Sequence, residues 1–258
     1  MIDTPAKQTP DFHAASLADA HEPLQGISKN TVKSFCYSGG MTLHRKLAGV
    51  LFDWDGTLID SFHADSQAYL AMFRELGLSW GLAELEKHYS PDWYTVYRRA
   101  GIAVERWDDA DRIWRAYYAK NPSQLMRGAR RVLGQLIRRH KLGLVTSGDR
   151  ERVTRQLKEF SLTRMFLARV CGGDTTEKKP HPAPLKLALQ KMKLEPQECI
   201  YVGDTPEDLE MAHAVGVRAV AVLGPFPTAD RLRAAKPEFL LKELEELPGL
   251  LKKICGKA

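Results

Sequence analysis

Short runs rich in apolar residues alternate with amphipathic segments along most of the chain after residue 47. Runs bounded by turn-forming residues predict buried strands, whereas the longer segments have the period of helices. The expected strands are residues 49–52, 142–146, 166–171, 198–202 and 217–222. The expected helices are residues 130–140, 150–160, 182–193 and 206–215. This alternation indicates an α/β fold with a doubly wound, Rossmann-like parallel sheet.

Residues 62–126 interrupt the alternation, because they have helical periodicity and no convincing strand. We expect a helical cap inserted directly after the first strand, where it can act as a lid over the carboxyl edge of the sheet. Most of its aromatic residues are expected to form its own core. The expected domains are an extension at residues 1–40, an α/β core at residues 41–61 and 127–258, and the cap at residues 62–126.

Length and composition are ordinary for a globular protein: 258 residues, 44% hydrophobic and 27% charged. No apolar run reaches membrane-spanning length, and the amino terminus lacks the apolar centre of a secretory signal, so we expect a cytoplasmic protein with no membrane partner.

Residues 1–40 have the composition of a disordered extension, with Met41 as a hypothetical functional start. Four separated cysteines predict reduced thiols rather than a disulfide or zinc site: Cys36, Cys171, Cys199 and Cys255.

The net charge of +6 raises the question of a nucleic-acid partner. The basic pairs lie in separate amphipathic segments, at residues 98–99, 130–131 and 138–139, where solvated helix faces explain them. Because no nucleic-acid motif accompanies the charge, we expect no nucleic-acid partner. A basic surface attracts small phosphorylated anions equally well.

Two carboxylates, Asp53 and Asp55, follow the first expected strand with one residue between them. The carboxyl ends of parallel strands form the edge at which open α/β sheets bind ligands. Because side chains alternate along a strand, both carboxylates can face the same side, one to attack and the other to move protons. The alternative is an Asp-rich turn closed by Gly56.

Two later segments place further polar groups beside the expected sheet edge. Thr146 and Ser147 end the second strand, where their hydroxyls either donate to a phosphoryl oxygen or cap the next helix. Residues 178–184 carry three prolines just before a helix, which would hold a lysine ammonium beside negative charge. A solvated lysine in a proline-rich loop is the alternative.

A fourth segment carries Asp204 at the end of the expected strand 198–202. Thr205 can cap the following helix, and Asp208 three positions later completes a capping box. Asp53 and Asp204 would repel each other unless a cation lay between them. Ligands that are all oxygen atoms suit Mg²⁺, which prefers few carboxylates together with substrate phosphate.

These segments resemble the four motifs of the haloacid dehalogenase superfamily of phosphohydrolases. The motifs occur in order at residues 53–58, Thr146, Lys179 and residues 203–208. The resemblance covers about residue 47 to the carboxyl end. Phosphoglycolate phosphatases are the most similar subgroup, because they carry a helical cap after the first motif and a Gly-Gly-Asp stretch, here residues 172–174.

The resemblance implies a phosphate-monoester hydrolase that forms an aspartyl-phosphate and acts on a small phosphorylated metabolite such as 2-phosphoglycolate. Asp53 would be the nucleophile, and Asp55 would be the general acid and base. Thr146, Ser147 and Lys179 would bind the phosphoryl group. A phosphosugar mutase related to β-phosphoglucomutase is the alternative on the same scaffold, and a non-catalytic binding protein is a second.

The resemblance also implies Mg²⁺ as the cofactor. The Asp53 and Asp204 carboxylates and the Asp55 backbone carbonyl would bind the ion, and Asp208 would order water around it. Residues 124–128 depart from the return to the core that is usual in the subgroup, which leaves the substrate open. Candidate cap contacts for an anionic leaving group are His63, Arg98 and Arg99. The sequence does not indicate an oligomeric state.

Overall fold

The computed structural model of the chain describes residues 47–254. The expectations for residues 1–40, for Met41 and for Cys36 and Cys255 therefore concern residues outside the described part. Of the two cysteines inside it, Cys171 and Cys199 are both buried and free. No helix within residues 47–254 is long and apolar enough to cross a membrane.

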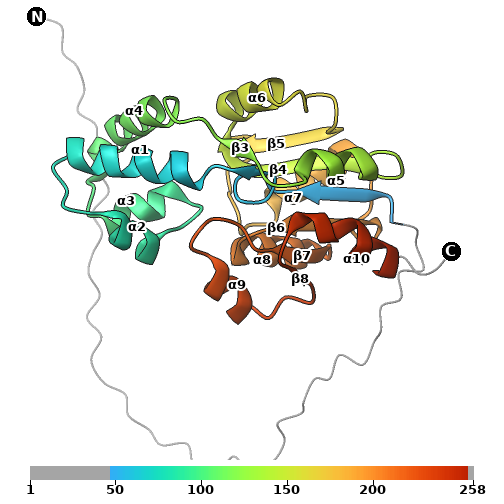
Figure 1. Cartoon of the computed structure of the whole chain (residues 1–258). Coiled ribbons are helices and arrows are strands. Elements are labelled where there is room, and N and C mark those ends of the chain that lie inside the picture. Colours follow the sequence, from blue (N-terminus) through green and yellow to red (C-terminus); the bar gives the residue numbers. More distant parts are fainter. Residues whose placement is uncertain (1–46, 255–258) are drawn as a thin grey trace, which may run out of the picture. The chain divides into compact units, whose positions relative to one another are not determined.

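Six parallel strands form the central sheet in the order β5-β4-β1-β6-β7-β8, which confirms the expected α/β class (Figure 1). The strands are β1 (Gly49–Phe52), β4 (Lys141–Asp149), β5 (Ala168–Gly172), β6 (Cys199–Gly203), β7 (Arg218–Val222) and β8 (Leu240–Leu241). β1 lies centrally, with Phe52 opposite both Leu144 of β4 and Val202 of β6. Because all pairs are parallel, the carboxyl ends share one edge.

Helices cover both faces of the sheet. They are α5 (Ala129–Leu136), α6 (Arg150–Glu159), α7 (Ala183–Met192), α8 (Pro206–Val215), α9 (Ala229–Ala234) and α10 (Leu247–Ile254), with 3₁₀ turns η2 (Pro196–Glu198) and η3 (Leu244–Glu246). Val50 and Phe52 pack in one apolar cluster with residues of α5, α6 and α10, whereas Leu51 packs in another with residues of α7, α8 and α9. Successive β1 residues thus face opposite layers, as a doubly wound sheet requires.

Four helices occupy the expected insert, α1 (Phe62–Glu75), α2 (Leu82–His88), α3 (Trp93–Arg99) and α4 (Trp107–Tyr118), with the 3₁₀ turn η1 (Val104–Arg106) before α4. We call α1–α4 the cap helices. Their aromatic core includes Tyr69, whose ring centroid lies 6.5 Å from that of Tyr97 and 6.2 Å from that of Trp114. This packing explains the helical periodicity.

The expectation that residues 62–126 contain no strand is wrong at one end. β3 (Gln124–Leu125) pairs antiparallel with β2 (Ile59–Asp60), which precedes the cap helices. The two short strands hold the ends of the insert together, and two residues are too few to show a period. The boundaries of the expected core and cap stay a prediction.

One helix and one strand end at other residues than the sequence predicts. The helix expected at residues 130–140 ends at Leu136 and is followed by a turn, in which the N–H groups of Arg139 and His140 both donate to the Leu136 carbonyl, at 3.0 and 2.9 Å. The strand expected at residues 142–146 continues to Asp149, which pairs with Gly172 after a shift of register.

Candidate active site

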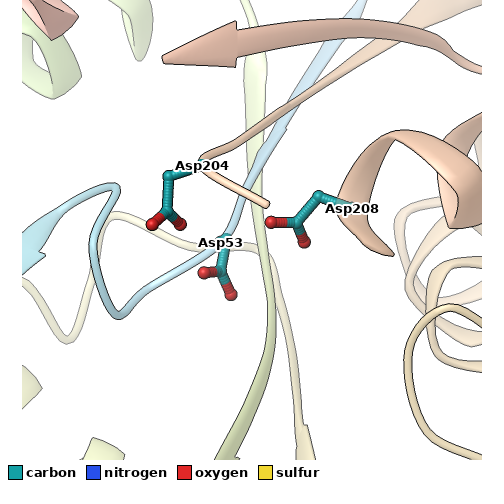
Figure 2. A group of neighbouring side chains, drawn as sticks. All are labelled: Asp53, Asp204 and Asp208. Carbon is teal, nitrogen blue, oxygen red and sulfur yellow. The ribbon is translucent and has the colours of Figure 1, made fainter. Parts of the chain in front are cut away.

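Three carboxylates from separate elements converge at the carboxyl edge of the sheet (Figure 2). Asp53 follows β1, Asp204 follows β6, and Asp208 lies in the first turn of α8. One oxygen atom of each lies within 4.8 Å of the others, and all three residues are buried. Because β1 and β6 are neighbours, joined after Phe52 by a 2.9 Å bond from Asp53 N to the Val202 carbonyl, their ends emerge together.

Burial and mutual repulsion make this acid cluster unfavourable without a cation. Desolvation by burial raises the pKa of Asp53 to about 7, with a further contribution from Asp208. Desolvation and the charges of Asp53 and Asp208 raise the pKa of Asp204 well above its ordinary value. Asp204 Oδ1 accepts a hydrogen bond from Thr57 Oγ1 at 3.1 Å, but Oδ2 is buried with no partner in the described structure. This set of donors fits a hard divalent cation such as Mg²⁺.

The chain leaves space around Asp204 by placing a glycine beside it. Gly56 has a φ of +80°, and a Cβ atom at this position would lie 2.2 Å from Asp204 Oδ2. Glycine therefore satisfies both the left-handed backbone and the close approach. The turn after β1 is thus shaped to fit the acid that follows β6.

Lys179 lies among the acids. Its Nζ donates to Asp53 Oδ1 at 2.6 Å and to Asp208 Oδ1 at 2.7 Å, and the residue is buried. Burial alone would lower the pKa of Lys179, but Asp208 and Asp53 raise it above its ordinary value, so the ammonium is charged. Thr205 and Asp208 form the expected capping box, in which Asp208 N donates to Thr205 Oγ1 and Thr205 N to Asp208 Oδ2, both at 3.2 Å.

Asp55 is held by Arg152, a residue that the sequence analysis missed. Arg152 Nη1 donates to Asp55 Oδ1 at 2.8 Å and Nη2 to Oδ2 at 2.7 Å, while Ser61 Oγ donates to Oδ1 at 2.7 Å. The guanidinium carbon lies 5.0 Å from the centroid of the Tyr118 ring. Burial raises the pKa of Asp55, but the charge and hydrogen bonds of Arg152 outweigh burial and lower it. Asp55 is therefore a carboxylate in this arrangement.

The hydroxyl residues of β4 lie in the same pocket. Thr146 Oγ1 accepts a hydrogen bond from Gly148 N at 3.0 Å, and both Thr146 and Ser147 line the pocket. The interpretation of these hydroxyls as helix caps is wrong, because the strand continues past them and Asp149 caps α6, accepting from Arg152 N at 3.0 Å. Their role in binding a phosphoryl group stays a prediction.

A cavity of about 110 Å³ lies between the acids and the cap helices. One water needs a cavity of roughly 10–15 Å³, so this one accommodates a small ligand. The cap side of the cavity is lined mainly by aromatic side chains, together with two carboxylates and one arginine: Asp65, Tyr69, Tyr89, Trp93, Tyr97, Asp111, Trp114, Arg115 and Tyr118.

None of the three candidate cap contacts, His63, Arg98 and Arg99, is among the lining residues of this cavity. Arg98 instead lies 3.4 Å from Asp92 Oδ2 and donates to Thr95, and Arg99 donates to a backbone carbonyl of α2. Both arginines lie in the last turn of α3, where they bond within the cap. The expectation that they contact a leaving group is therefore wrong for this cavity.

Comparison with known proteins places most of the chain in one family. Residues 50–222 match the family model of haloacid dehalogenase-like hydrolases. Pyrophosphatase PpaX of Bacillus velezensis is 27% identical over 208 residues, covering 79% of this chain and 95% of that protein. Phosphoglycolate phosphatase of Yersinia pestis is 28% identical over 225 residues, covering 80% and 94%. A haloacid dehalogenase-like hydrolase from Streptococcus pneumoniae has the same fold, with a TM-score of 0.69 at 23% identity over 80% of this chain and 99% of that one.

Proposed function

The chain belongs to the haloacid dehalogenase-like hydrolases, and we propose that it is a Mg²⁺-dependent phosphatase that hydrolyses a phosphate monoester of a small metabolite. The observation that carries this proposal is the buried cluster of Asp53, Asp204 and Asp208 with Lys179 inserted between two of its members. An anionic phosphoryl group approaches such acids only when cations offset their charge. Relatives with phosphatase and pyrophosphatase names support the same chemistry.

Asp53 is the proposed nucleophile. Its carboxylate would attack phosphorus as the ester oxygen leaves, which gives an aspartyl-phosphate. Lys179, 2.6 Å from Asp53 Oδ1, would offset the charge of the transferring phosphoryl group. Thr146 and Ser147 would donate hydroxyl hydrogen bonds to its oxygen atoms.

Asp55 is the proposed general acid and base. It would protonate the leaving alcohol and then take a proton from the water that hydrolyses the aspartyl-phosphate. Paired with Arg152, it is a carboxylate, which is the form needed for the second step. The first step needs a proton on Asp55, so the contact with Arg152 has to weaken when the substrate binds.

Mg²⁺ is the proposed cofactor. The carboxylates of Asp53 and Asp204 and the backbone carbonyl of Asp55 would hold it, with Asp208 completing the acid cluster. When bound, the ion would neutralise the acids and the incoming phosphate. A cytoplasmic location and a small-molecule substrate with no nucleic-acid or membrane partner stay predictions, as does 2-phosphoglycolate itself.

The test is phosphate release from p-nitrophenyl phosphate and a panel of metabolite monoesters, with and without Mg²⁺. Asp53→Asn should lower turnover by at least about 1000-fold, as removal of a nucleophile does, while the far-UV circular dichroism stays the same. Asp109→Asn is the control, because Asp109 is exposed on α4 and pairs with Arg112. Near-wild-type turnover by Asp53→Asn contradicts the proposal, and isomer production from a hexose phosphate instead of phosphate release indicates the mutase.

A further inference from the structure

The cations that line the cavity are all paired with carboxylates. Lys179 and Arg152 bond to the acids described above, and Arg115 Nη1 lies 3.1 Å from Asp149 Oδ2. Against these three cations, seven carboxylates line the same cavity: Asp53, Asp55, Asp65, Asp111, Asp149, Asp204 and Asp208. Acidic residues therefore outnumber basic residues in this lining by seven to three. Within residues 47–254, each lining cation thus already has a carboxylate partner.

Like Asp111, Asp65 is a carboxylate on the cap side that has no ion-pair partner in the described part of the chain. It lies on α1, whereas Asp111 on α4 accepts a hydrogen bond from Tyr97 Oη at 2.8 Å. Burial and the nearby charge of Asp55 raise the pKa of Asp65 to about 8. A positive group beside Asp65 would favour its charged form, and a negative group would disfavour it.

Aromatic rings complete the cap side of the cavity. Tyr69 lies between Tyr97 and Trp114, and Trp114 stacks on Tyr118 with ring centroids 4.7 Å apart. Ring faces attract cations through their quadrupole, and aromatic cages bind ammonium groups. One ring of this wall already contacts a cation of the chain, since Lys178 Nζ lies 3.7 Å from the centroid of the Trp93 ring.

From the paired cations, the unpaired Asp65 and the aromatic wall, we infer that the cavity selects phosphate monoesters whose leaving alcohol carries a positive charge, as a phosphorylated amino alcohol does. The inference rests on the proposed phosphatase function and concerns the leaving group of that same site. An anionic leaving group such as glycolate meets lining cations that are already paired, and it would favour the neutral form of Asp65. An ester of a neutral alcohol has an intermediate kcat/KM, because its leaving group gains contact with the rings but no charge interaction.

Three esters of nearly equal size and different charge test this inference: O-phosphoethanolamine, 2-hydroxyethyl phosphate and 2-phosphoglycolate. With Mg²⁺, kcat/KM should fall in that order, by about tenfold at each step, the size of one partly desolvated charge or cation–π contact. If p-nitrophenyl phosphate is hydrolysed but the order differs, or O-phosphoethanolamine is not hydrolysed, the inference is overturned and the phosphatase function stands. If none of the four esters is hydrolysed, the proposed function itself fails.

The Asp65→Asn variant tests whether the Asp65 carboxylate is the source of this selectivity. The ratio of kcat/KM for O-phosphoethanolamine to that for 2-hydroxyethyl phosphate should fall about tenfold, because the amide cannot ionise beside a positive group. The ratio of kcat/KM for 2-phosphoglycolate to that for 2-hydroxyethyl phosphate should not fall, because neither ester depends on an ionised residue 65. A purely structural role of Asp65 would lower all three values together. Asp109→Asn, which removes an exposed carboxylate of α4 outside the cavity, should leave both ratios as in the wild type. Unchanged ratios in Asp65→Asn overturn the assignment to this carboxylate.

Discussion

Replacing Arg152 by methionine should destabilise the protein far more than the loss of an ordinary helix arginine. The Arg152 side chain is only 10% exposed and holds Asp55 through bonds of 2.8 and 2.7 Å. Methionine keeps an unbranched apolar stem but leaves the Asp55 carboxylate with Ser61 as its hydrogen-bond donor. Removing one partner of a buried ion pair costs about 3–5 kcal/mol, because the other charge stays buried without compensation.

Equilibrium urea unfolding at pH 7 measures this loss directly. In a thermal scan the same loss corresponds to a decrease in Tm of roughly 6–20 °C, at about 2–4 °C per kcal/mol for a domain of this size. Arg150→Met is the matched control on the same helix. Arg150 also pairs with a carboxylate, Asp174, but its side chain is 56% exposed, so its loss should cost below about 1 kcal/mol.

A double-mutant cycle decides whether the pair itself is the cause. Asp55→Asn should also destabilise, since it leaves the Arg152 guanidinium buried without its carboxylate, and the double variant should be less unstable than the sum of the two. We expect a coupling free energy of about 2–3 kcal/mol. Additive effects, or a loss in Arg152→Met no larger than in Arg150→Met, would refute the buried ion pair as the source of stability.

Three further predictions concern the acids. Chelation of divalent cations by EDTA should abolish phosphate release and lower the Tm, and added Mg²⁺ should restore both, because the ion offsets the repulsion between Asp53 and Asp204. Gly56→Ala should cost at least about 1–2 kcal/mol in urea unfolding for its φ of +80° and should weaken Mg²⁺ binding in calorimetry by displacing Asp204. The pKa of Asp65 is raised to about 8 from 3.8, so the native state holds a proton that the unfolded state releases. The wild type should therefore lose stability relative to Asp65→Asn as pH rises from about 4 to about 8, and a constant difference over this range would contradict the shift.

The strands of the sheet were predictable because their burial leaves runs of apolar residues in the sequence. All four residues of β1 are buried, and a short apolar run that ends in Asp53 shows both the strand and its functional end. β8 was not predicted, since its two residues are too few for any period. The expected strand 142–146 was too short, because the hydroxyls of Thr146 and Ser147 fit the start of a helix, although β4 continues through them to Asp149.

Arg152 shows why part of the site was not predictable. It lies in an amphipathic segment rich in charged residues, where the common explanation is a solvated helix face. Nothing in the local pattern distinguishes it from Arg150, which is exposed on the same helix. Only the packing of α6 against the loop after β1 brings Arg152 to Asp55, a residue 97 positions earlier in the chain.

Arg152 also connects Asp55, the proposed general acid and base, to the cap helices. Tyr118, the last residue of α4, accepts hydrogen bonds at its hydroxyl from Arg152 Nη1 at 3.2 Å and from Gln156 Nε2 at 3.1 Å. Gln156 Oε1 in turn accepts from Trp54 Nε1 at 2.9 Å, beside Asp55 in the sequence. Because these bonds run from α4 through α6 to the loop after β1, a shift of α4 changes the contacts that hold Asp55. The leaving group, which meets the cap wall, and the residue that would protonate it are therefore positioned by one connected set of side chains.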